Sequence, residues 1–328
     1  MKKIILLLIA LTLLGCSRNS ELAKLGYSKQ DIDIISNLSE DTQMFFLNGY
    51  DEKYSTIINH PNFIENKLDK YIKYYDDFDI DFLFEAVNND YNLKLIQDIF
   101  DDKYYMEKNR DIYLNNLDKF DDARSIVEYV NVQRYDNYYE NEKPTDLSKN
   151  YYMLVNKYNY LTSDYIPNDL VEVDEMYGAG YLRQAVMEAF IPLYEDALEQ
   201  GYDLRVVSPY RQYSTQERLY NMYLEQDPQE IVDTYSARPG HSEHQTGLCI
   251  DVSVPGYSLD DFYLTDASDW LKENCYKYGF IIRYPEGKDD ITGYQWEPWQ
   301  IRFVDDIAKD VYESGITYDE YYAYYLDK

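Results

Sequence analysis

The spacing of apolar residues changes near residue 123, and this change limits what the chain can fold into. Before it, apolar residues recur with the period of an α-helix, as in the run LGYSKQDIDIISNL. After it, helical stretches alternate with short strand-like stretches such as TGLCIDVSV and FIIRYP, without a repeated strand–helix–strand rhythm. The sequence therefore predicts an all-helical segment over residues 17–123, followed by an α+β domain over residues 124–328.

Two stretches of the helical segment resemble one another at an offset of roughly 40 residues. One begins MFFLNGYDEK and the other FLFEAVNNDY. Each contains a short apolar run, a polar turn and a longer amphipathic helix. This pattern predicts a pair of helical-hairpin repeats.

Local signals mark several element boundaries in the second part of the chain. The stretch RSIVEYVNVQRY alternates between apolar and polar residues and predicts a strand. In STQERLYNMYLEQ, Ser214 is expected to cap a helix, with Glu217 completing a capping box. A second capping box is expected from Thr317 to Glu320, near the end of the chain.

The composition restricts the class of partner. The chain has 328 residues and a net charge of -30, which disfavours nucleic acid because a phosphate backbone is bound by clustered lysines and arginines. Its 40 tyrosines predict a core and a surface rich in aromatic rings whose hydroxyls need a hydrogen-bond partner or water. The strong acidity is typical of a soluble protein kept from aggregating by self-repulsion.

The first residues, MKKIILLLIALTLLGC, combine two lysines with a short apolar run. A run of this length predicts a secretory signal over residues 1–16, not a transmembrane helix. The ending Leu-Leu-Gly-Cys resembles a bacterial lipobox, in which the cysteine is acylated and becomes the new N-terminus. We therefore expect lipid on Cys16 to hold the protein at the outer face of a cell membrane, with the helical segment as a spacer.

The stretch HSEHQTGLCID is the most informative for function. It places His244 and Asp251 on either side of a turn at Gly247 that leads into a strand. An imidazole and a carboxylate brought together in this way can bind zinc. Taken alone, the pair indicates a metal site only weakly, because a His–Asp hydrogen bond is a common structural feature.

Three separated stretches, SPYRQYSTQ, SEHQTGLCID and YPEGKDDITGYQWEPW, together resemble the VanY-type D-alanyl-D-alanine carboxypeptidases. Members of this family are zinc peptidases that remove the terminal D-Ala from peptidoglycan stem peptides. The resemblance implies a D,D-peptidase or hedgehog-like fold, with a central, mainly antiparallel sheet flanked by helices. It also implies zinc as the cofactor and a peptidoglycan stem peptide as the ligand.

The resemblance also implies roles for individual residues. His244 and Asp251 correspond to zinc ligands, and Glu297 corresponds to the general base that activates the zinc-bound water. The residues expected to bind the substrate are Arg211, Gln216, Ser242 and Trp299. The planar guanidinium fork of an arginine suits the C-terminal carboxylate of a peptide.

One metal-ligand position departs from the family pattern. The last motif of the family usually reads Glu-Pro-Trp-His, and its histidine is the third zinc ligand, but here the motif ends at Gln300. An amide oxygen is a weaker donor to zinc than a neutral imidazole, so we expect a weakened site. Two other residues could replace the missing ligand: His241, and Cys249, which has the same strand parity as Asp251.

Further positions differ from what relatives tend to have. Cys249 and Cys275 stand where relatives tend to have alanine, which suggests a disulfide between a strand and the following helix. Such a bond would exclude Cys249 as a metal ligand. Pro209 and Asp305 each stand where relatives usually have glycine.

Three hypotheses follow for the function. The protein is an active zinc carboxypeptidase, or it is an inactive family member that binds peptidoglycan or a protein partner, or its acidic helical segment is the working part. The chemistry of Gln300 favours the inactive family member slightly, whereas the resemblance favours the carboxypeptidase. The sequence names no protein partner.

Overall fold

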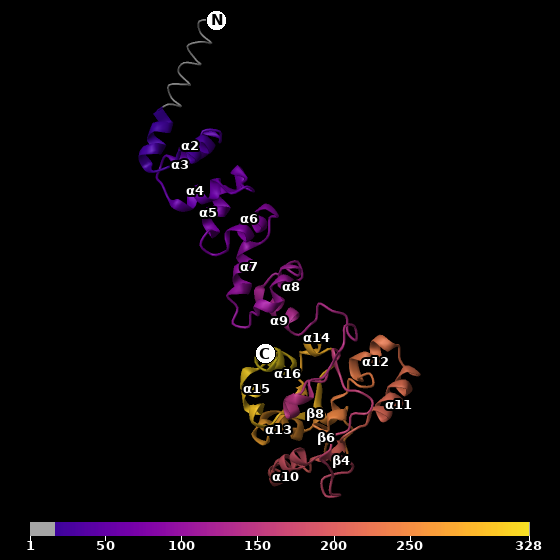
Figure 1. Ribbon diagram of the computed structural model, residues 1–328. Coiled ribbons are helices and arrows are strands. Elements are labelled where there is room, and N and C mark those ends of the chain that lie inside the picture. Colours follow the sequence, from indigo (N-terminus) through magenta and orange to yellow (C-terminus); the bar gives the residue numbers. More distant parts are fainter. Residues whose placement is uncertain (1–16, 328) are drawn as a thin grey trace, which may run out of the picture. The chain divides into compact units, whose positions relative to one another are not determined.

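The computed structural model describes residues 17–327, so the expected signal peptide and the expected lipidation site, Cys16, lie outside the described residues (Figure 1). The described residues form two compact units. One takes in residues 17–102 with Asp121–Ala123, and the other takes in Lys103–Phe120 with residues from Arg124 onward. Between residues 17 and 327 no helix combines the length and the apolar character needed to cross a bilayer.

The first unit is built from short helices, as predicted. Its named α-helices are α2 (Lys29–Ile35), α3 (Glu40–Phe46), α4 (Glu52–Ile58), α5 (Leu68–Tyr74), α6 (Ile80–Asn88) and α7 (Leu93–Phe100). Helix α2 begins with a capping box between Ser28 and Asp31. The core joins residues from most of these helices, among them Ile35, Phe46 and Tyr71, which are fully buried.

Helices α5 and α8 (Arg110–Leu114) each begin after a one-turn 3₁₀ helix. The residues before these turns, Ile64 and Met106, have nearly the same backbone angles, φ -123° and ψ 116° against φ -124° and ψ 116°. The separation of these two turns along the chain agrees with the offset between the two similar stretches of the sequence. The two-repeat organisation itself stays a prediction.

The stretch RSIVEYVNVQRY forms a helix, and the prediction of a strand is wrong. Helix α9 (Ala123–Asn131) buries Ile126, Val127 and Val130 on one face. Two of these residues are four apart, which is one helical turn, so the burial follows the helical period and not the alternation read from the sequence. Arg124 donates to Glu128 across the same turn, at 3.0 Å.

The second unit contains the predicted central antiparallel sheet. Its four strands have the order β5-β6-β8-β7, and every neighbouring pair is antiparallel. The strands are β5 (Arg205–Ser208), β6 (Cys249–Ser253), β7 (Phe280–Tyr284) and β8 (Glu297–Phe303). Two small sheets lie outside it, one parallel, of β1 (Lys143–Pro144) and β2 (Asn159–Tyr160), and one antiparallel, of β3 (Leu170–Glu172) and β4 (Tyr181–Arg183).

Both faces of the central sheet are covered, which explains why β6 is buried along its whole length. On one face Ile250, Val252 and Ile301 pack in a single core with α10 (Gln184–Glu199) and α13 (Asp266–Asn274). On the other face Ile281 packs with residues of α15 (Ala308–Ser314) and α16 (Tyr318–Tyr321). Successive residues of a strand point to opposite faces of the sheet, so neighbouring residues pack against different sets of helices.

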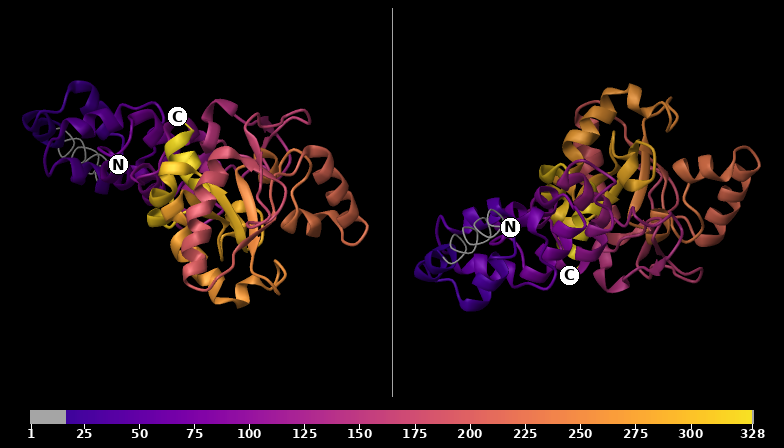
Figure 2. Two further views of the ribbon diagram at one scale, coloured as in Figure 1. Left: turned by 90° about the horizontal axis from the view of Figure 1, so that it is seen from below. Right: turned by 90° about the horizontal axis from the view of Figure 1, so that it is seen from above.

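The remaining helices lie around this sheet. Helices α11 (Tyr213–Leu224) and α12 (Gln229–Tyr235) stand out on one side, which is clearest in Figure 2, and α14 (Asp289–Thr292) precedes β8. The N-cap of α11 is Gln212 and makes no side-chain cap bond, so the capping box predicted at Ser214 is wrong; Ser214 already lies in the first turn. The capping box at Thr317 and Glu320 is confirmed.

Asp305 has a φ of 53°, in the left-handed region that favours glycine. We expect Asp305→Gly to be more stable than Asp305→Ala by about 1 kcal/mol, because both remove the carboxylate but only alanine keeps a Cβ. Urea unfolding of the two variants measures the difference. Asp306 is the control, because it lies in the same 3₁₀ turn but has no positive φ. There the glycine variant should be less stable than the alanine variant. Equal stabilities of the two Asp305 variants would contradict the prediction.

Candidate functional site

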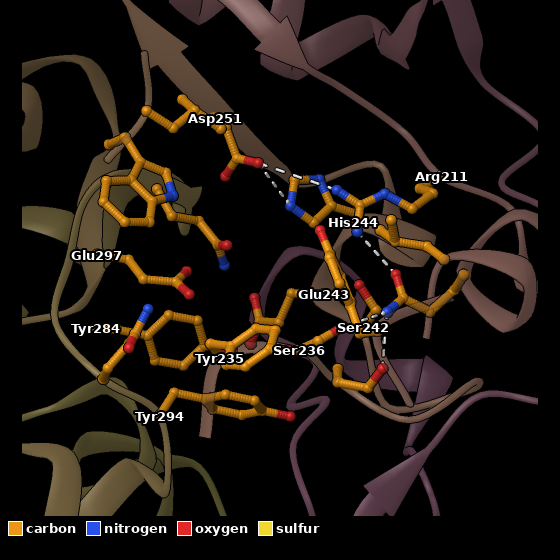
Figure 3. Close-up of a pocket in the computed structure, with 18 of the residues that line it drawn as sticks. Arg211, Tyr235, Ser236, Ser242, Glu243, His244, Asp251, Tyr284, Tyr294 and Glu297 are labelled. Atoms are coloured by element: carbon orange, nitrogen blue, oxygen red, sulfur yellow. Dashed lines mark hydrogen bonds and ion pairs between the residues drawn. The ribbon is translucent and has the colours of Figure 1, made fainter. Parts of the chain in front are cut away.

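The strand register brings the chemically active side chains to one end of the central sheet. Asp251 on β6 is paired with Gln300 on β8 and with Ser208 on β5. Tyr284 on β7 is paired with Glu297 at the start of β8. These strand ends line a cavity of about 390 Å³ whose side chains are drawn in Figure 3.

An irregularity in the sheet lets two residues of β8 share this cavity. Glu297 and Gln300 are three residues apart, so regular alternation would turn them to opposite faces. The register between β7 and β8 shifts between Ile282 and Tyr284, and both side chains reach the cavity. Glu297 and Gln300 can therefore both face the cavity only because the pairing of β7 with β8 is irregular at this point.

All the residues that the sequence resemblance indicated for ligand or metal binding line this one cavity. They are Arg211, Gln216, Ser242, His244, Asp251, Glu297, Trp299 and Gln300. The two alternative metal ligands, His241 and Cys249, do not line it. The family resemblance thus predicted which residues lie together in one cavity. Their chemical roles do not follow from proximity alone.

The imidazole of His244 is held in one orientation. Its Nδ1 lies 2.9 Å from the carbonyl oxygen of Pro209, and its Nε2 lies 3.3 Å from Oδ2 of Asp251. Gly247, with a φ of 67°, ends the short 3₁₀ turn that carries His244 and leads the chain into β6. A carbonyl can only accept, so Nδ1 carries a proton and Nε2 is directed at the carboxylate.

The spacing of His244 and Asp251 suits two ligands of one metal ion. Two donors at about 2.1 Å from a tetrahedral zinc lie about 3.4 Å apart, close to the observed 3.3 Å. A catalytic zinc needs a third protein ligand and an open position. In residues 17–327 no group of three histidine, cysteine, aspartate or glutamate side chains is arranged to hold a metal ion.

The amide of Gln300 lies where a third ligand would be required. With its nitrogen turned toward the carboxylates, it donates to Oε2 of Glu297 at 2.9 Å and to Oδ1 of Asp251 at 3.3 Å. The opposite orientation would place the amide oxygen against two carboxylate oxygens. The donating orientation gives both carboxyl groups a hydrogen-bond partner. An amide oxygen is a weaker donor to zinc than a neutral imidazole, so a donor set of His244, Asp251 and Gln300 fits a catalytic zinc poorly.

Glu297 is a buried carboxyl, only 7% exposed. Burial raises its pKa well above the usual range, and the negative charge of Asp251 adds to the effect, while Arg211 opposes it. A carboxyl group in these surroundings tends to keep its proton.

Neither alternative ligand completes a metal site. The Nδ1 of His241 lies 2.7 Å from the carbonyl oxygen of Asn156, and its Nε2 lies 3.2 Å from Glu142. Cys249 shares the strand face of Asp251, as its parity predicted, but burial and the nearby Glu243 raise the pKa of its thiol. His241 is thus held by partners outside the cavity, and Cys249 is a free, buried thiol that does not line it.

The predicted disulfide between Cys249 and Cys275 is wrong. Both cysteines are free and buried. Cys275 packs in the core with Ile250 and Val252, which project from the opposite side of β6 to Cys249. The sheet itself separates the two thiols.

Arg211 is fixed at the wall of the cavity by two neutral partners. Its guanidinium donates to Oε1 of Gln216 at 2.7 Å and to Oγ of Ser208 at 2.7 Å, and it lies 4.0 Å from Asp251. Gln216 in turn donates to the carbonyl of Ala237 at 2.7 Å. A guanidinium has five donor hydrogens, so donors remain for a ligand. Gln216 positions Arg211, and Ser208 is a partner that the sequence did not indicate.

A buried ion cluster supports His244 from behind. The neighbouring Glu243 accepts from Arg283 at 2.7 Å and also from Arg302, and all three side chains are inaccessible to solvent. Arg283 donates to Asp319 at 2.6 Å as well. Two arginines surrounding one carboxylate lower the pKa of Glu243 despite its burial. No motif in the sequence indicated this cluster.

A buried lysine, Lys157, also supports the cavity, and no motif in the sequence indicated it. The ε-amine of Lys157, a residue only 1% exposed, lies 4.0 Å from the ring centre of Tyr294 and 4.9 Å from that of Tyr138. It donates to the carbonyl of Asp233. Tyr294 lines the cavity, so Lys157 braces one wall. Gly293 leaves room for the amine, since a Cβ there would lie 2.5 Å from Cε of Lys157.

Burial lowers the pKa of Lys157 to about 7, although the Asp233 carboxylate opposes the shift. The unfolded chain binds this proton below about pH 10.5 and the folded protein only below about pH 7. Stability should therefore rise from pH 7 to 9.5, by about 1.4 kcal/mol per pH unit relative to Lys157→Met. Urea unfolding of the natural protein and of Lys157→Met between pH 7 and 9.5 tests this pH dependence. Lys272→Met, which replaces an exposed lysine, is the control. If stability changes equally with pH in Lys157→Met and in the natural protein, the prediction is contradicted.

Comparisons with known proteins agree with this geometry. The family model described as VanY, D-alanyl-D-alanine carboxypeptidase, matches residues 179–306. The protein YodJ of Bacillus subtilis (strain 168) is 38% identical over 184 residues, which cover 53% of this chain and 67% of that protein. A D-alanyl-D-alanine carboxypeptidase of Enterococcus faecium is 38% identical over 125 residues, which cover 38% of each chain.

Two solved structures of peptidases are also similar to this chain. The LD-carboxypeptidase LdcB, whose structure was reported for its peptidoglycan recognition, is 34% identical with a TM-score of 0.52, and the match covers 56% of this chain and 91% of that one. A VanY D,D-pentapeptidase mutant solved in complex with Zn(II) is 28% identical with a TM-score of 0.46, over 52% of this chain and 97% of that one. The match of the family model and the similarity to YodJ, two thirds of which this chain covers, show that the chain belongs to the VanY D-alanyl-D-alanine carboxypeptidase family.

Proposed function

We propose that this protein binds the C-terminal end of peptidoglycan stem peptides without hydrolysing them. The observation that carries the proposal is the place of Gln300, which lies between Glu297 and Asp251 and can donate to both. An amide in this place supplies the two carboxylates with hydrogen bonds where the family has a histidine ligand. The pocket is thereby complete without an ion.

The same contacts argue against hydrolysis. Zinc catalysis needs three protein ligands, and among residues 17–327 only His244 and Asp251 line the cavity with the required donor type and spacing. Glu297 accepts a hydrogen bond from the amide of Gln300, in the place where the family has a histidine ligand. The residues that the resemblance assigns to substrate binding, in contrast, all line the cavity.

Arg211 is the residue we assign to the ligand's terminal carboxylate. Gln216 and Ser208 hold its guanidinium at the cavity wall, and its remaining donor hydrogens suit a planar anion. Ser242, which is 4% exposed, lines the same cavity and offers a hydroxyl for a peptide backbone. Trp299 contributes an aromatic surface at the rim.

We also propose that the protein acts outside the cytoplasm. The lipobox-like ending at Cys16 supports a lipid anchor on the outer face of the cell membrane, where peptidoglycan is accessible. The helical segment then serves as a spacer between the membrane and the pocket. The net charge of -30 supports a ligand other than nucleic acid.

A binding titration tests the role of Arg211. We expect the full-length protein to bind a pentapeptide ending in D-Ala-D-Ala, and Arg211→Met to weaken the binding by about 10- to 100-fold, because a charged hydrogen bond is lost. The matched control is the same peptide with a C-terminal amide, whose binding should hardly change on substitution. Equal binding of the acid and the amide by the natural protein would refute this assignment.

The Gln300→His variant tests the absence of hydrolysis. We expect the natural protein to hold no stoichiometric zinc and to release no D-Ala, whereas Gln300→His should bind one zinc per chain, because it restores the third imidazole or carboxylate donor. Zinc content after gel filtration and D-Ala release are the two measurements. Gln300→Asn, which keeps the amide, is the control and should behave like the natural protein.

One observation favours a second candidate, zinc-dependent removal of D-Ala. The 3.3 Å separation of His244 Nε2 and Asp251 Oδ2 suits two zinc ligands, and an amide oxygen of Gln300 could act as a weak third donor. The same experiment separates the two candidates. Zinc binding together with D-Ala release by the natural protein would establish the second and refute the first.

A further inference from the structure

Helices α11 and α12, with the residues that follow them, form an arm (residues 213–238) that stands out from the sheet (Figure 2). The arm carries one wall of the cavity. Leu219 and Tyr223 of α11 line this wall, and so do Tyr235, at the end of α12, and Ser236, which comes next (Figure 3). The width of the cavity therefore depends on how the end of α12 is held.

Several polar contacts of α12 stay inside the arm. The carboxylate of Asp233 accepts from Tyr220 of α11 at 2.8 Å and from Arg238, which follows α12, at 2.8 Å. Gln216 of α11 donates to the carbonyl of Ala237 at 2.7 Å. These bonds join α12 to α11 and to the chain after it, so they do not fix the arm to the rest of the domain.

Other contacts join the end of α12 to the rest of the domain through its carbonyl groups. The amine of Lys157, which precedes β2, donates to the carbonyl of Asp233. The backbone N–H of Gln295, which precedes β8, donates to the carbonyl of Thr234 at 2.9 Å. Lys157 therefore supplies one of the hydrogen bonds that hold this wall of the cavity in place.

Three tyrosine rings surround the amine of Lys157, and we call them the tyrosine cage. The nitrogen lies 4.0 Å from the ring centre of Tyr294, 4.9 Å from that of Tyr138 and 5.1 Å from that of Tyr139. The guanidinium of Arg238, from the arm, lies 4.0 Å from the ring centre of Tyr139. The cage is thus built from the loop before β1 and the chain before β8, and the arm packs against it.

The cage is an unfavourable place for a positive charge. Burial lowers the pKa of Lys157 to about 7, although the carboxylate of Asp233 opposes the shift. The nearby guanidinium groups of Arg238 and Arg134 act in the same direction as burial. Burial also raises the pKa values of the three cage tyrosines, so their rings stay neutral between pH 7 and 9.5.

We infer that Lys157 is a latch that holds the arm against the rest of the domain, and that proton uptake by its amine releases the arm and widens the cavity. While the neutral amine stays in the cage, it keeps its bond to α12. A charged amine gains by leaving the cage for water, and α12 then loses this bond. The inference does not depend on the proposed function, because it concerns the position of a wall and not the ligand.

The direction of the pH effect follows from proton binding. In the released arm the amine of Lys157 lies in water and binds its proton below about pH 10.5, whereas in the cage it does so only below about pH 7. Between these two values the released form binds the additional proton, so release becomes easier as the pH falls. Below pH 7 both forms carry the proton, and a further fall has no effect.

Hydrogen exchange of the full-length protein between pH 7 and 9.5 tests the latch. Protection factors, corrected for the intrinsic exchange rate at each pH, are compared for peptides that cover α12 and β6. We expect α12 to be less protected than β6, because the arm opens while the sheet stays folded. The protection factor of α12 should rise with pH by up to about tenfold per pH unit.

Two variants make the test specific. Lys157→Met has no proton to bind and should make the protection of α12 nearly independent of pH. Lys272→Met, which replaces an exposed lysine, should keep the pH dependence of the natural protein. Thermal unfolding checks that both variants are folded.

Three outcomes would overturn the inference. Equal protection of α12 and β6 would mean that the arm opens only when the whole domain unfolds. A less protected α12 whose protection does not change with pH would exclude Lys157 as the latch, and so would a pH dependence that persists in Lys157→Met. The first two outcomes are measured on the natural protein, so they decide even if Lys157→Met does not fold. None of them requires peptide binding, so the proposed function can fail while the latch stands.

Discussion

The contact on which the rest of this site depends is the burial of Glu243 between two arginines. Arg283 comes from β7 and Arg302 from β8, so the carboxylate ties the short turn before β6 to two strands of the sheet. Removing one member of such a cluster leaves an uncompensated buried charge, which typically destabilises a protein by about 3–5 kcal/mol. The position of His244 relative to Asp251, and hence the shape of the cavity, is set by this anchoring.

Much of the fold and most of the site could be predicted from the sequence. The turn at Gly247 and the strand after it place His244 near Asp251, and the motifs around Arg211 and Glu297 mark the other walls. Short-range spacing accounts for the first of these, whereas the place of Arg211 and Glu297 in the same cavity followed from the family resemblance. The antiparallel sheet and its covering helices followed from the family resemblance and are confirmed.

The failures have a common physical cause, which is that alternation in sequence does not reveal what a segment packs against. The residues of α9 alternate well enough for a strand, yet their burial follows a helix. Cys249 and Cys275 both stand where relatives tend to have alanine, which suggested a bond, but the sheet lies between them. Lys157 and Glu243 gave no signal because their importance comes from partners far away in the chain.

The Gln300 amide has a consequence for the two carboxyl groups beside it. It can donate to both Asp251 and Glu297, so each has a hydrogen-bond partner even though the charge of Asp251 still raises the pKa of Glu297. The strands that carry these residues pair as the family resemblance implies, although Gln300 departs from the family motif. The fold of the sheet is thus independent of the donor type at this one position.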